Sequence, residues 1–457
     1  MVPSVAIGTL LNRLALELSV HPTVRFARSI FALLLVAAIG LMPTSAVDAQ
    51  EADWPQWRGV QRDGKAPDTG LIDSWGDDGP PLLWSTEGAG GGFSSISVTG
   101  GRIFTMGDHD DEQYVVAFDD ATGERLWMTA IGPAWEDEYG GPRATPTVVD
   151  DVAYAIGTEG DLVALDVATG EIRWHLNMQT DLNGSTPLAG NGWTWKYAES
   201  PLVDGDRVVV TPGGESSFIA ALDRHTGEVE WSSAVPEFGE EGVPGAGYSS
   251  AVISEGAGVR QYVQLMGNGI VGVEAATGRV LWTYSRMANP VANIPTPVID
   301  GDYVLTATGY GSGAALLQLV ADGDGVRAEE VWFNEAGTMQ NHHGGMVIHD
   351  GTIYLGQGHN RGFPQAVDFM SGEVLWGPER NDGDGSGSVL YADGHLYYRY
   401  QNGVMVLAEA TRDGYVEKGS FTIPNPAQFS WAHLVIADGR LYVREQDAIY
   451  VYDVRAN

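Results

Sequence analysis

The 457-residue sequence contains 60 Asp and Glu against 25 Lys and Arg, a net charge of −35, and no cysteine. A surface this acidic repels nucleic acid and anionic lipid headgroups, so we expect neither as a partner. The charge favours solubility, or contact with a basic partner, instead. The absence of cysteine excludes disulfides, thiolate catalysis, thiolate-bound zinc and a lipid anchor on cysteine.

The N-terminal part of the chain has the pattern of an export signal. An apolar run over residues 30–41 follows two arginines and precedes a small-residue cleavage pattern that ends at Ala49. The run is shorter than the roughly 20 apolar residues that span a bilayer, and no later stretch is long enough. We therefore expect residues 1–49 to be a signal peptide, with a start that can lie downstream of Met1, and a periplasmic or secreted mature protein.

One pattern, Ala-x-Asp-x-x-x-Gly-x-x-x-Trp, recurs along the rest of the chain. It begins, with unchanged spacing, at Ala117, Ala164, Ala221 and Ala366, and a softened copy begins at Gly272. Its alternating residues predict a strand, a turn whose glycine allows positive φ, and a second strand that ends in tryptophan. We expect the Asp to accept hydrogen bonds from the turn amides and the Trp to fill the gap between neighbouring sheets.

A second pattern precedes each hairpin: a strand, an Asp-Gly turn and another strand, as in residues 200–212 and 346–356. Each repeat therefore supplies four antiparallel strands at a period of about 45 to 50 residues, as a propeller blade requires. The outermost strands of the repeats centre on Trp84, Trp127, Trp174, Trp231, Trp282, Trp332, Trp376 and Phe421.

The two ends of the repeat region complement each other. The strand around Trp84 has no partner strands before it, whereas residues 434–454 supply three strands with no Trp strand after them. We expect the Trp84 strand to pair with residues 448–454 and close a ring, which removes exposed sheet edges. The sequence thus predicts an all-β fold, an eight-bladed β-propeller over residues 80–457 that follows a lead segment, residues 50–79. Neither the helical spacing of an α/β fold nor the shorter period of a solenoid is present.

These repeats resemble the tryptophan-docking motif of two kinds of PQQ-like (pyrroloquinoline quinone-like) propeller: the quinoprotein alcohol dehydrogenases and the outer-membrane assembly lipoprotein. The opening segment 53–59 (DWPQWRG) and the stretches 141–146, 247–250 and 340–345 also resemble exported proteins of this repeat type. The resemblance covers essentially residues 53 to 457. It implies the propeller fold and leaves the activity open.

Two departures from the resemblance concern chemistry. Quinoprotein dehydrogenases of this type stack the quinone between a tryptophan and a disulfide of adjacent cysteines, and their longer loops supply calcium ligands and a catalytic aspartate. The assembly lipoprotein has a lipidated cysteine. This chain has no cysteine, and no calcium ligand set can be matched to it. PQQ with calcium is therefore an open alternative and not an expected cofactor, and enzymatic activity, which would be that of a quinoprotein-type dehydrogenase, stays open.

The long loops between blades are the expected place for a site, because they share one face and function favours distinctive loops on a rigid frame. Many of their residues fall at or just before an innermost strand and should point to the central axis. Aromatic side chains beside cations would suit a flat or anionic ligand. The candidate ligand-binding residues are Arg143, Trp195, Lys196, Glu199, Tyr248, Asn341, His342, His343, Trp431 and His433.

Each candidate also has a purely structural interpretation. The tryptophans can plug the channel, and Arg143 can form an ion pair with Glu199 instead of holding a ligand. His342 and His343 would point to opposite faces of an extended strand, so both could not bind one metal. As ligand-binding groups, the histidines would strengthen the binding of an anion as the pH falls from about 7.5 to 5.5.

Three acidic loops, residues 108–112, 322–325 and 382–387, invite a calcium interpretation. The last matches the first half of an EF-hand-like loop, with Asp393 at its twelfth position. Because Asp393 belongs to the Asp-Gly turn that every blade repeats, solvated turns are the better interpretation, and we expect no metal site.

The sequence therefore favours an exported propeller that binds a small ligand, a glycan or a protein segment at the mouth of its central channel. A PQQ-dependent oxidoreductase acting on alcohols or sugars is the first alternative. An envelope assembly scaffold is the second.

Overall fold

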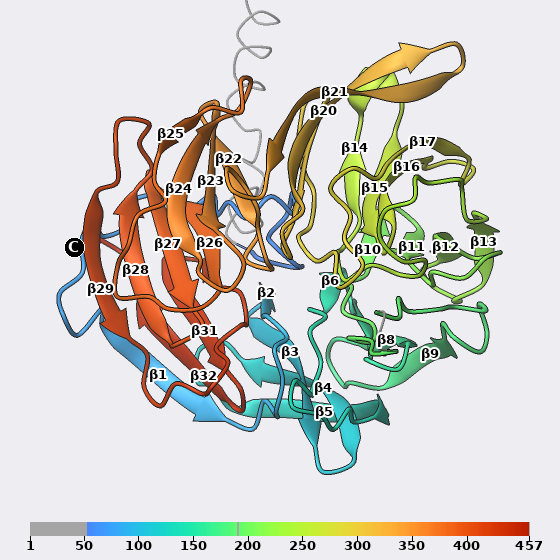
Figure 1. The fold of residues 1–457 in the computed structure, drawn as a ribbon. Coiled ribbons are helices and arrows are strands. Elements are labelled where there is room, and N and C mark those ends of the chain that lie inside the picture. Colours follow the sequence, from blue (N-terminus) through green and yellow to red (C-terminus); the bar gives the residue numbers. More distant parts are fainter. Residues whose placement is uncertain (1–52, 190–191, 457) are drawn as a thin grey trace, which may run out of the picture. The chain divides into compact units, whose positions relative to one another are not determined.

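Eight four-stranded antiparallel sheets form the propeller, as predicted (Figure 1). The computed structural model describes residues 53–189 and 192–456, so the predicted signal peptide lies outside the described residues. The only helical element in these residues is one turn of 3-10 helix, η1 (Gly256–Gly258).

Seven blades follow chain order from their innermost to their outermost strand, and the eighth takes its outermost strand from the start of the repeat region. The first two blades are β2 (Ser97–Thr99), β3 (Arg102–His109), β4 (Glu112–Asp119) and β5 (Arg125–Pro133), then β6 (Thr147–Val149), β7 (Val152–Ile156), β8 (Asp161–Asp166) and β9 (Ile172–Asn177). The next two are β10 (Leu202–Asp204), β11 (Arg207–Val210), β12 (Ala220–Asp223) and β13 (Val229–Ser232), then β14 (Val252–Ser254), β15 (Gln261–Met266), β16 (Gly269–Glu274) and β17 (Val280–Tyr284). They are followed by β18 (Val298–Asp300), β19 (Tyr303–Thr308), β20 (Gly313–Asp322) and β21 (Gly325–Glu335), then β22 (Met346–His349), β23 (Thr352–Gln357), β24 (Phe363–Asp368) and β25 (Val374–Trp376). The seventh blade is β26 (Gly387–Ala392), β27 (His395–Tyr400), β28 (Val404–Glu409) and β29 (Glu417–Thr422), and the eighth is β30 (Val435–Ala437), β31 (Arg440–Glu445), β32 (Ala448–Asp453) and β1 (Leu82–Glu87).

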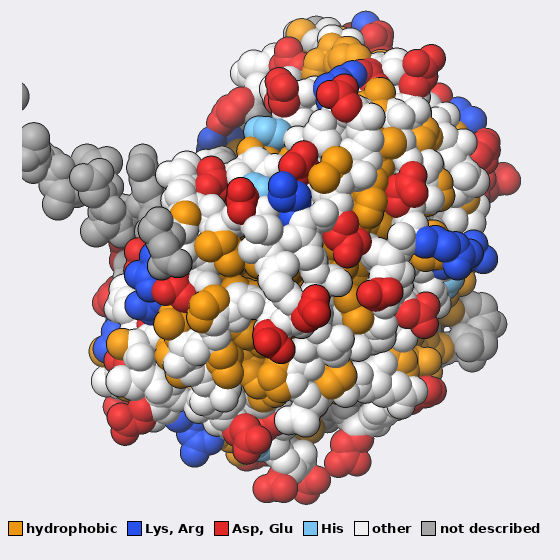
Figure 2. Space-filling model, turned by 90° about the vertical axis from the view of Figure 1, so that its left-hand side faces the viewer, with side chains coloured by type: hydrophobic (Ala, Val, Ile, Leu, Met, Phe, Trp, Pro, Cys, Tyr) orange, Lys and Arg blue, Asp and Glu red, His pale blue; other side chains and the backbone are white. Residues whose placement is uncertain are grey.

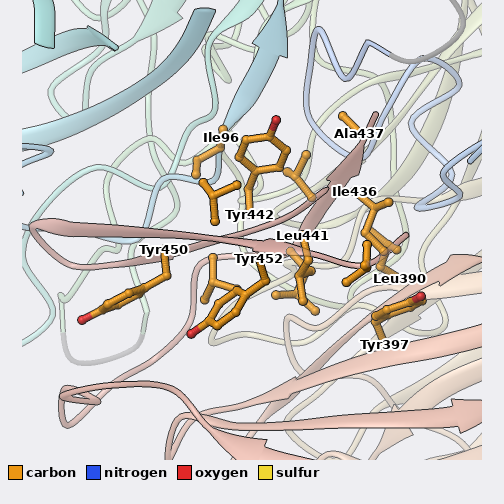
Figure 3. Close-up of a cluster of buried hydrophobic side chains, with 14 of the residues drawn as sticks. Ile96, Leu390, Tyr397, Ile436, Ala437, Leu441, Tyr442, Tyr450 and Tyr452 are labelled. Carbon is orange, nitrogen blue, oxygen red and sulfur yellow. The ribbon is translucent and has the colours of Figure 1, made fainter. Parts of the chain in front are cut away.

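The eighth blade closes the ring as predicted. In it β1 pairs antiparallel with β32, and Trp84 lies opposite Val451; the two strands lie side by side in Figure 1, β1 in blue and β32 in red. Figure 3 shows the core at this junction, where Tyr442 and Tyr452 of the closing blade lie among apolar side chains of its two neighbours. The closing blade is thus packed on both faces like any other.

The repeated motif joins each blade to the next. Asp223 accepts hydrogen bonds from the amides of His225 and Thr226, both 2.9 Å, and so shapes the turn at Gly227. The indole of Trp174, from the preceding blade, lies over that glycine and donates from Nε1 to the Arg224 carbonyl at 2.9 Å. The ring is half-buried, so the tryptophan covers the next blade's turn instead of being sealed between the sheets.

One motif tryptophan docks differently. Trp282 donates to Oε1 of Gln261 within its own blade at 2.6 Å. The next blade has no Thr-Gly turn to receive it, because β20 and β21 form a long hairpin that extends beyond the other strands in Figure 1.

The lead segment, residues 53–79, begins at the inner strands of the ring and ends at its outer strands. Trp54 and Val98 of the innermost strand β2 exchange backbone hydrogen bonds of 2.8 Å. Farther along, the Ile72 amide donates to the Val454 carbonyl at 2.8 Å, and the Trp75 amide donates to the Lys418 carbonyl of the outermost strand β29 at 2.9 Å. The first part of the segment therefore lies against the channel, and its last part crosses to the outside of the ring.

Arg62 of the lead segment forms buried hydrogen bonds to several blades. Its buried guanidinium donates to the carbonyls of Ser200 (3.1 Å), Ala251 (3.0 Å) and Pro201, and to Oγ1 of Thr147 (3.3 Å). These residues belong to three successive blades. One side chain therefore ties together the inner strands of three blades.

The acidic residues do not form one dominant patch on the face shown in Figure 2, where they are spread among apolar and uncharged side chains. This distribution suits a role in solubility. Within residues 53–189 and 192–456, no helix has the length and hydropathy needed to cross a bilayer.

Candidate functional site

A cavity of about 910 Å³, counted with its opening to solvent, lies at the predicted mouth of the channel. Ser200, Ser250, Thr296 and His433 line it, and each stands two residues before an innermost strand. The start of such a strand therefore aims side chains at the axis, as expected. The other lining residues are Trp57, Arg58, Phe93, Arg143, Trp195, Ala198, Tyr248, Ile294, Pro295, Tyr310, His342, His343, Gly345 and Trp431.

The lining combines aromatic rings with cations and contains no Asp or Glu. Seven of the ten predicted site residues belong to it: Arg143, Trp195, Tyr248, His342, His343, Trp431 and His433. In a chain of net charge −35, a cavity with two arginines and no carboxylate is a local reversal of charge, which favours anionic over cationic ligands.

Arg143 lies among aromatic rings and not against a carboxylate. Its guanidinium carbon is 4.7 Å from the ring centre of Trp135, 5.5 Å from that of Phe93 and 5.8 Å from that of Trp195. It donates to the carbonyls of Gly141 and Tyr139 at 3.2 and 2.5 Å. Burial lowers its pKa to about 10, so it stays charged at neutral pH, and it makes no ion pair with Glu199 or with any other described residue.

Trp195 and Trp431 form an aromatic wall connected through Tyr139. The Tyr139 ring centre is 5.0 Å from that of Trp195 and 5.8 Å from that of Trp431. Trp431 donates from Nε1 to Gln401 at 2.9 Å, whereas the buried Nε1 of Trp195 has no partner. The hydroxyl of Tyr248 accepts a 3.3 Å hydrogen bond from the Trp195 amide and so helps to hold this wall.

The histidine pair is arranged differently from the sequence-based expectation. Residues 342–344 form a bend before β22 instead of an extended strand, so His342 and His343 both line the cavity, with ring centres 4.6 Å apart. His342 is engaged on both nitrogens, by Ser386 at 2.7 Å and by Tyr310 at 3.2 Å. Nε2 of His343 is buried without a partner.

The predicted pH dependence of the histidines is also wrong. Burial lowers the pKa of His343 and of His433 to about 3, with nearby arginines adding to the effect, and burial lowers that of His342 well below its ordinary value. His343 and His433 are therefore neutral between pH 5.5 and 7.5, and burial shifts the pKa of His342 in the same direction. They therefore serve as neutral hydrogen-bonding rings, and the positive charge of the cavity comes from arginine.

Two lead-segment residues complete the cavity from below. Trp57 donates from Nε1 to Thr296 at 2.9 Å, and its ring centre is 4.5 Å from that of His433. Arg58 is 3% exposed and donates from Nη2 to the carbonyls of Asp63 (3.0 Å) and Met346 (2.5 Å). Only the resemblance of the segment 53–59 to related proteins singled out these residues in the sequence.

The other three predicted residues do not line the cavity. Lys196 forms an ion pair with Glu159 at 2.8 Å. Glu199 accepts hydrogen bonds from the amide and hydroxyl of Thr211 at 2.8 and 3.0 Å, and burial raises its pKa to about 8. Asn341, also fully buried, shapes its own loop by accepting the Gly345 amide at 2.9 Å.

The described residues contain no group of three or more His, Cys, Asp or Glu side chains that could hold a metal ion. The Oδ2 atom of Asp393, the residue at the twelfth position of the EF-hand-like pattern, accepts the backbone amide of Leu71 at 2.8 Å. This carboxylate is therefore part of the contact between the lead segment and the ring.

Comparisons with known proteins agree with this architecture. A PQQ-type family model described as "Outer membrane protein assembly factor BamB" matches residues 76–194 and 111–378. The chain is 23% identical over 297 residues to the outer membrane protein assembly factor BamB of Yersinia pestis, covering 61% of this chain and 66% of that protein. It is 26% identical over 120 residues to the same factor of Alteromonas naphthalenivorans, covering 24% and 26%. The chain thus spans just under two thirds of the first relative and about a quarter of the second.

Solved structures share the fold at low identity. BamB from Moraxella catarrhalis superposes with a TM-score of 0.55 at 16% identity and covers 82% of this chain and 98% of its own. A quinohemoprotein alcohol dehydrogenase from Pseudomonas putida HK5 gives a TM-score of 0.58 at 15% identity and covers 89% and 81%. Together with the eight-bladed ring and the family match over most of the repeat region, these similarities establish that the chain belongs to the PQQ-like β-propeller family, to which the BamB assembly factors also belong.

Proposed function

We propose that this protein is an exported binding protein that takes up a small planar ligand in the cavity at the channel mouth. The observation that supports this most is the lining itself, which places six Phe, Trp and Tyr side chains beside two arginines and no carboxylate. A plug needs only bulk, whereas these walls leave a cavity between them that opens to solvent, and small-molecule sites are clefts or cavities of this kind. Planar rings can stack on Trp195 and Trp431 while Arg143 contacts a ring face.

A neutral planar probe tests this proposal without assuming the charge of the ligand. We expect 2-naphthamide to bind the mature protein in calorimetric titrations and Trp195→Ala to weaken its binding about tenfold, since aromatic pairs contribute roughly 0.5–1.5 kcal/mol beyond area burial. Trp174→Ala is the matched control, because that indole lies on an outer strand away from the cavity. Equal affinity in wild type and Trp195→Ala would contradict the proposal.

The oxidoreductase alternative fits these residues poorly. Calcium requires several oxygen ligands, chiefly carboxylates, and the cavity lining contains no Asp or Glu. The chain also has no cysteine for the disulfide on which related dehydrogenases stack the quinone. Titration of PQQ with calcium and with a chelator separates the two functions: metal-dependent binding would favour the dehydrogenase, and binding insensitive to the chelator would favour a simple planar-ligand site.

A role in envelope assembly is the second alternative, and the names of the BamB relatives support it. In this case the loops at the channel mouth would hold an extended protein segment instead of a small molecule. Crosslinking from a photoreactive residue at position 431 in envelope extracts tests it: a discrete protein adduct would favour assembly, and its absence together with probe binding would favour the small ligand.

A further inference from the structure

We infer that the floor of the cavity is a carboxylate-binding subsite built around Arg58, so that the ligand is a planar molecule with a carboxylate on its inner edge. This inference rests on the proposed function, since it specifies the chemistry of the same cavity. It assigns to the lead segment a part in ligand selection, in addition to its part in closing the channel.

Arg58 has hydrogen-bond donors without partners. Its Nη2 atom donates to two backbone carbonyls, but Nε and Nη1 are buried and have no hydrogen-bond partner. Leaving the donors of a buried cation unpaired is costly, and folded proteins leave few such groups. An acceptor supplied by a ligand in the adjoining cavity would satisfy them.

The positive charge of Arg58 also lacks a paired carboxylate. Among the described residues no Asp or Glu forms an ion pair with Arg58; burial lowers its pKa to about 10, and Asp63 opposes this only through a longer-range attraction. The guanidinium remains charged at neutral pH and is not neutralised locally. Buried charges are normally paired, so a negatively charged ligand group is the complement that this position lacks.

The neighbours of Arg58 also fix the position of its side chain. Gly64 and Gly345 lie against the guanidinium, and a Cβ atom at either position would come within 2.5 Å of it. Both glycines have positive φ, +77° and +75°. The backbone is thus shaped around Arg58 from both sides, which fixes the position of this cavity-lining side chain.

The remaining unpaired polar atoms of the lining point to the same chemistry. The Trp195 Nε1 is a donor only, and Nε2 of the neutral His343 can donate as well. The unpaired groups in this cavity therefore call for acceptor atoms. A carboxylate, with its two acceptor oxygens, meets that need better than an amide or an amine, and its charge distinguishes it from a neutral carbonyl.

The test compares 2-naphthoate with 2-naphthamide, which share ring and size but differ in charge. In wild type the acid should bind at least about tenfold more tightly, as charge-assisted hydrogen bonds allow. Arg58→Gln should reduce this acid-to-amide ratio to near one while the affinity for naphthamide stays within about threefold. Arg58→Lys, which keeps the charge, should retain most of the preference. Arg62→Gln, in the same segment but outside the cavity lining, should leave the ratio unchanged.

Each other result counts against a defined part of the argument. Equal binding of both probes to wild type would overturn the carboxylate subsite and leave the planar-ligand function standing. Failure of both probes to bind would overturn the proposed function and the subsite with it. A ratio that survives in Arg58→Gln but is lost in Arg143→Gln would place the carboxylate at the aromatic wall and overturn the assignment to Arg58.

Discussion

Replacing Gly227 with alanine should destabilise the propeller much more than the same change at Gly205, although both glycines lie in turns of one blade. Their φ angles, +75° and +60°, are both left-handed, so either alanine costs about 1–2 kcal/mol in backbone strain. Only at Gly227 would the new Cβ meet another group. It would lie 2.9 Å from the indole of Trp174, whereas a Cβ at Gly205 has nothing within 4 Å.

The clash at Gly227 must push the indole off the turn. This breaks the 2.9 Å hydrogen bond from Nε1 to the Arg224 carbonyl, which contributes about 0.5–1.5 kcal/mol. It also exposes part of a half-buried ring, a loss of roughly 1–2 kcal/mol. Together with strain, Gly227→Ala should lower the free energy of unfolding by about 3–5 kcal/mol, and Gly205→Ala by about 1–2 kcal/mol.

Urea denaturation of four proteins measures the effect: wild type, Gly227→Ala, Trp174→Ala and the double variant. In the Trp174→Ala background the glycine substitution should cost only the strain, about 1–2 kcal/mol, because the ring it would displace is gone. The coupling energy isolates the docking of the tryptophan on the turn. If Gly227→Ala costs the same in both backgrounds, the indole does not hold the turn and this account of how blades are joined is wrong.

Three further predictions concern closure, the channel and pH. Deleting residues 80–88 removes the outer strand of the eighth blade and should leave β32 with an open edge, so the protein should aggregate in light-scattering measurements; a monomer with unchanged melting temperature would refute closure. Arg62→Gln should lower the free energy of unfolding by about 2–4 kcal/mol, since it removes hydrogen bonds to the buried Ser200 and Ala251 carbonyls of two neighbouring blades; denaturant melts showing a loss below about 1 kcal/mol would contradict that role. His433 is neutral in the fold, because burial lowers its pKa to about 3 from 6.5 in the unfolded chain. The free energy of unfolding is therefore undiminished by this group above pH 6.5, and it decreases as the pH falls from 6.5 toward 3, because only the unfolded chain takes up the proton. His433→Gln should therefore remove roughly 2 kcal/mol of the stability difference between pH 7 and pH 5, measured by urea melts at both pH values; an unchanged difference would mean that the imidazole is solvated.

The fold could be predicted from the sequence because every blade has its own local markers. The Asp-Gly turn, the motif glycine and the outer tryptophan all occur within about 50 residues of one another in each repeat. The strand around Trp84 indicated ring closure because no partner strands precede it in the sequence. Local markers do not show how a tryptophan docks. That Trp174 lies half-exposed over a turn, and that Trp282 bonds within its own blade, depend on the shape of the neighbouring blade.

The site could be predicted only where position in the blade determines direction. Arg143, Tyr248 and His433 precede innermost strands and line the cavity, whereas Glu199 and Asn341 precede such strands too and bond within the ring instead. Lys196 comes from the same kind of loop but has a φ of +61° and pairs with Glu159, a local turn that no periodicity indicates. Arg58 was missed because the contact that places it at the cavity, with the Met346 carbonyl, lies 288 residues away along the chain.

Closing the ring also decides how the molecule can come apart. In an open array of repeats the terminal repeats can fray one at a time, because each contacts only its neighbours. Here β1 and β32 share one blade and the lead segment is bonded to inner strands around the ring, so there is no terminal blade to lose. Opening any blade breaks two interfaces at once, and partial unfolding brings little gain in entropy for that cost. Native-state hydrogen exchange should therefore find the slowest amides distributed over all eight blades, with a common opening free energy close to that of global unfolding.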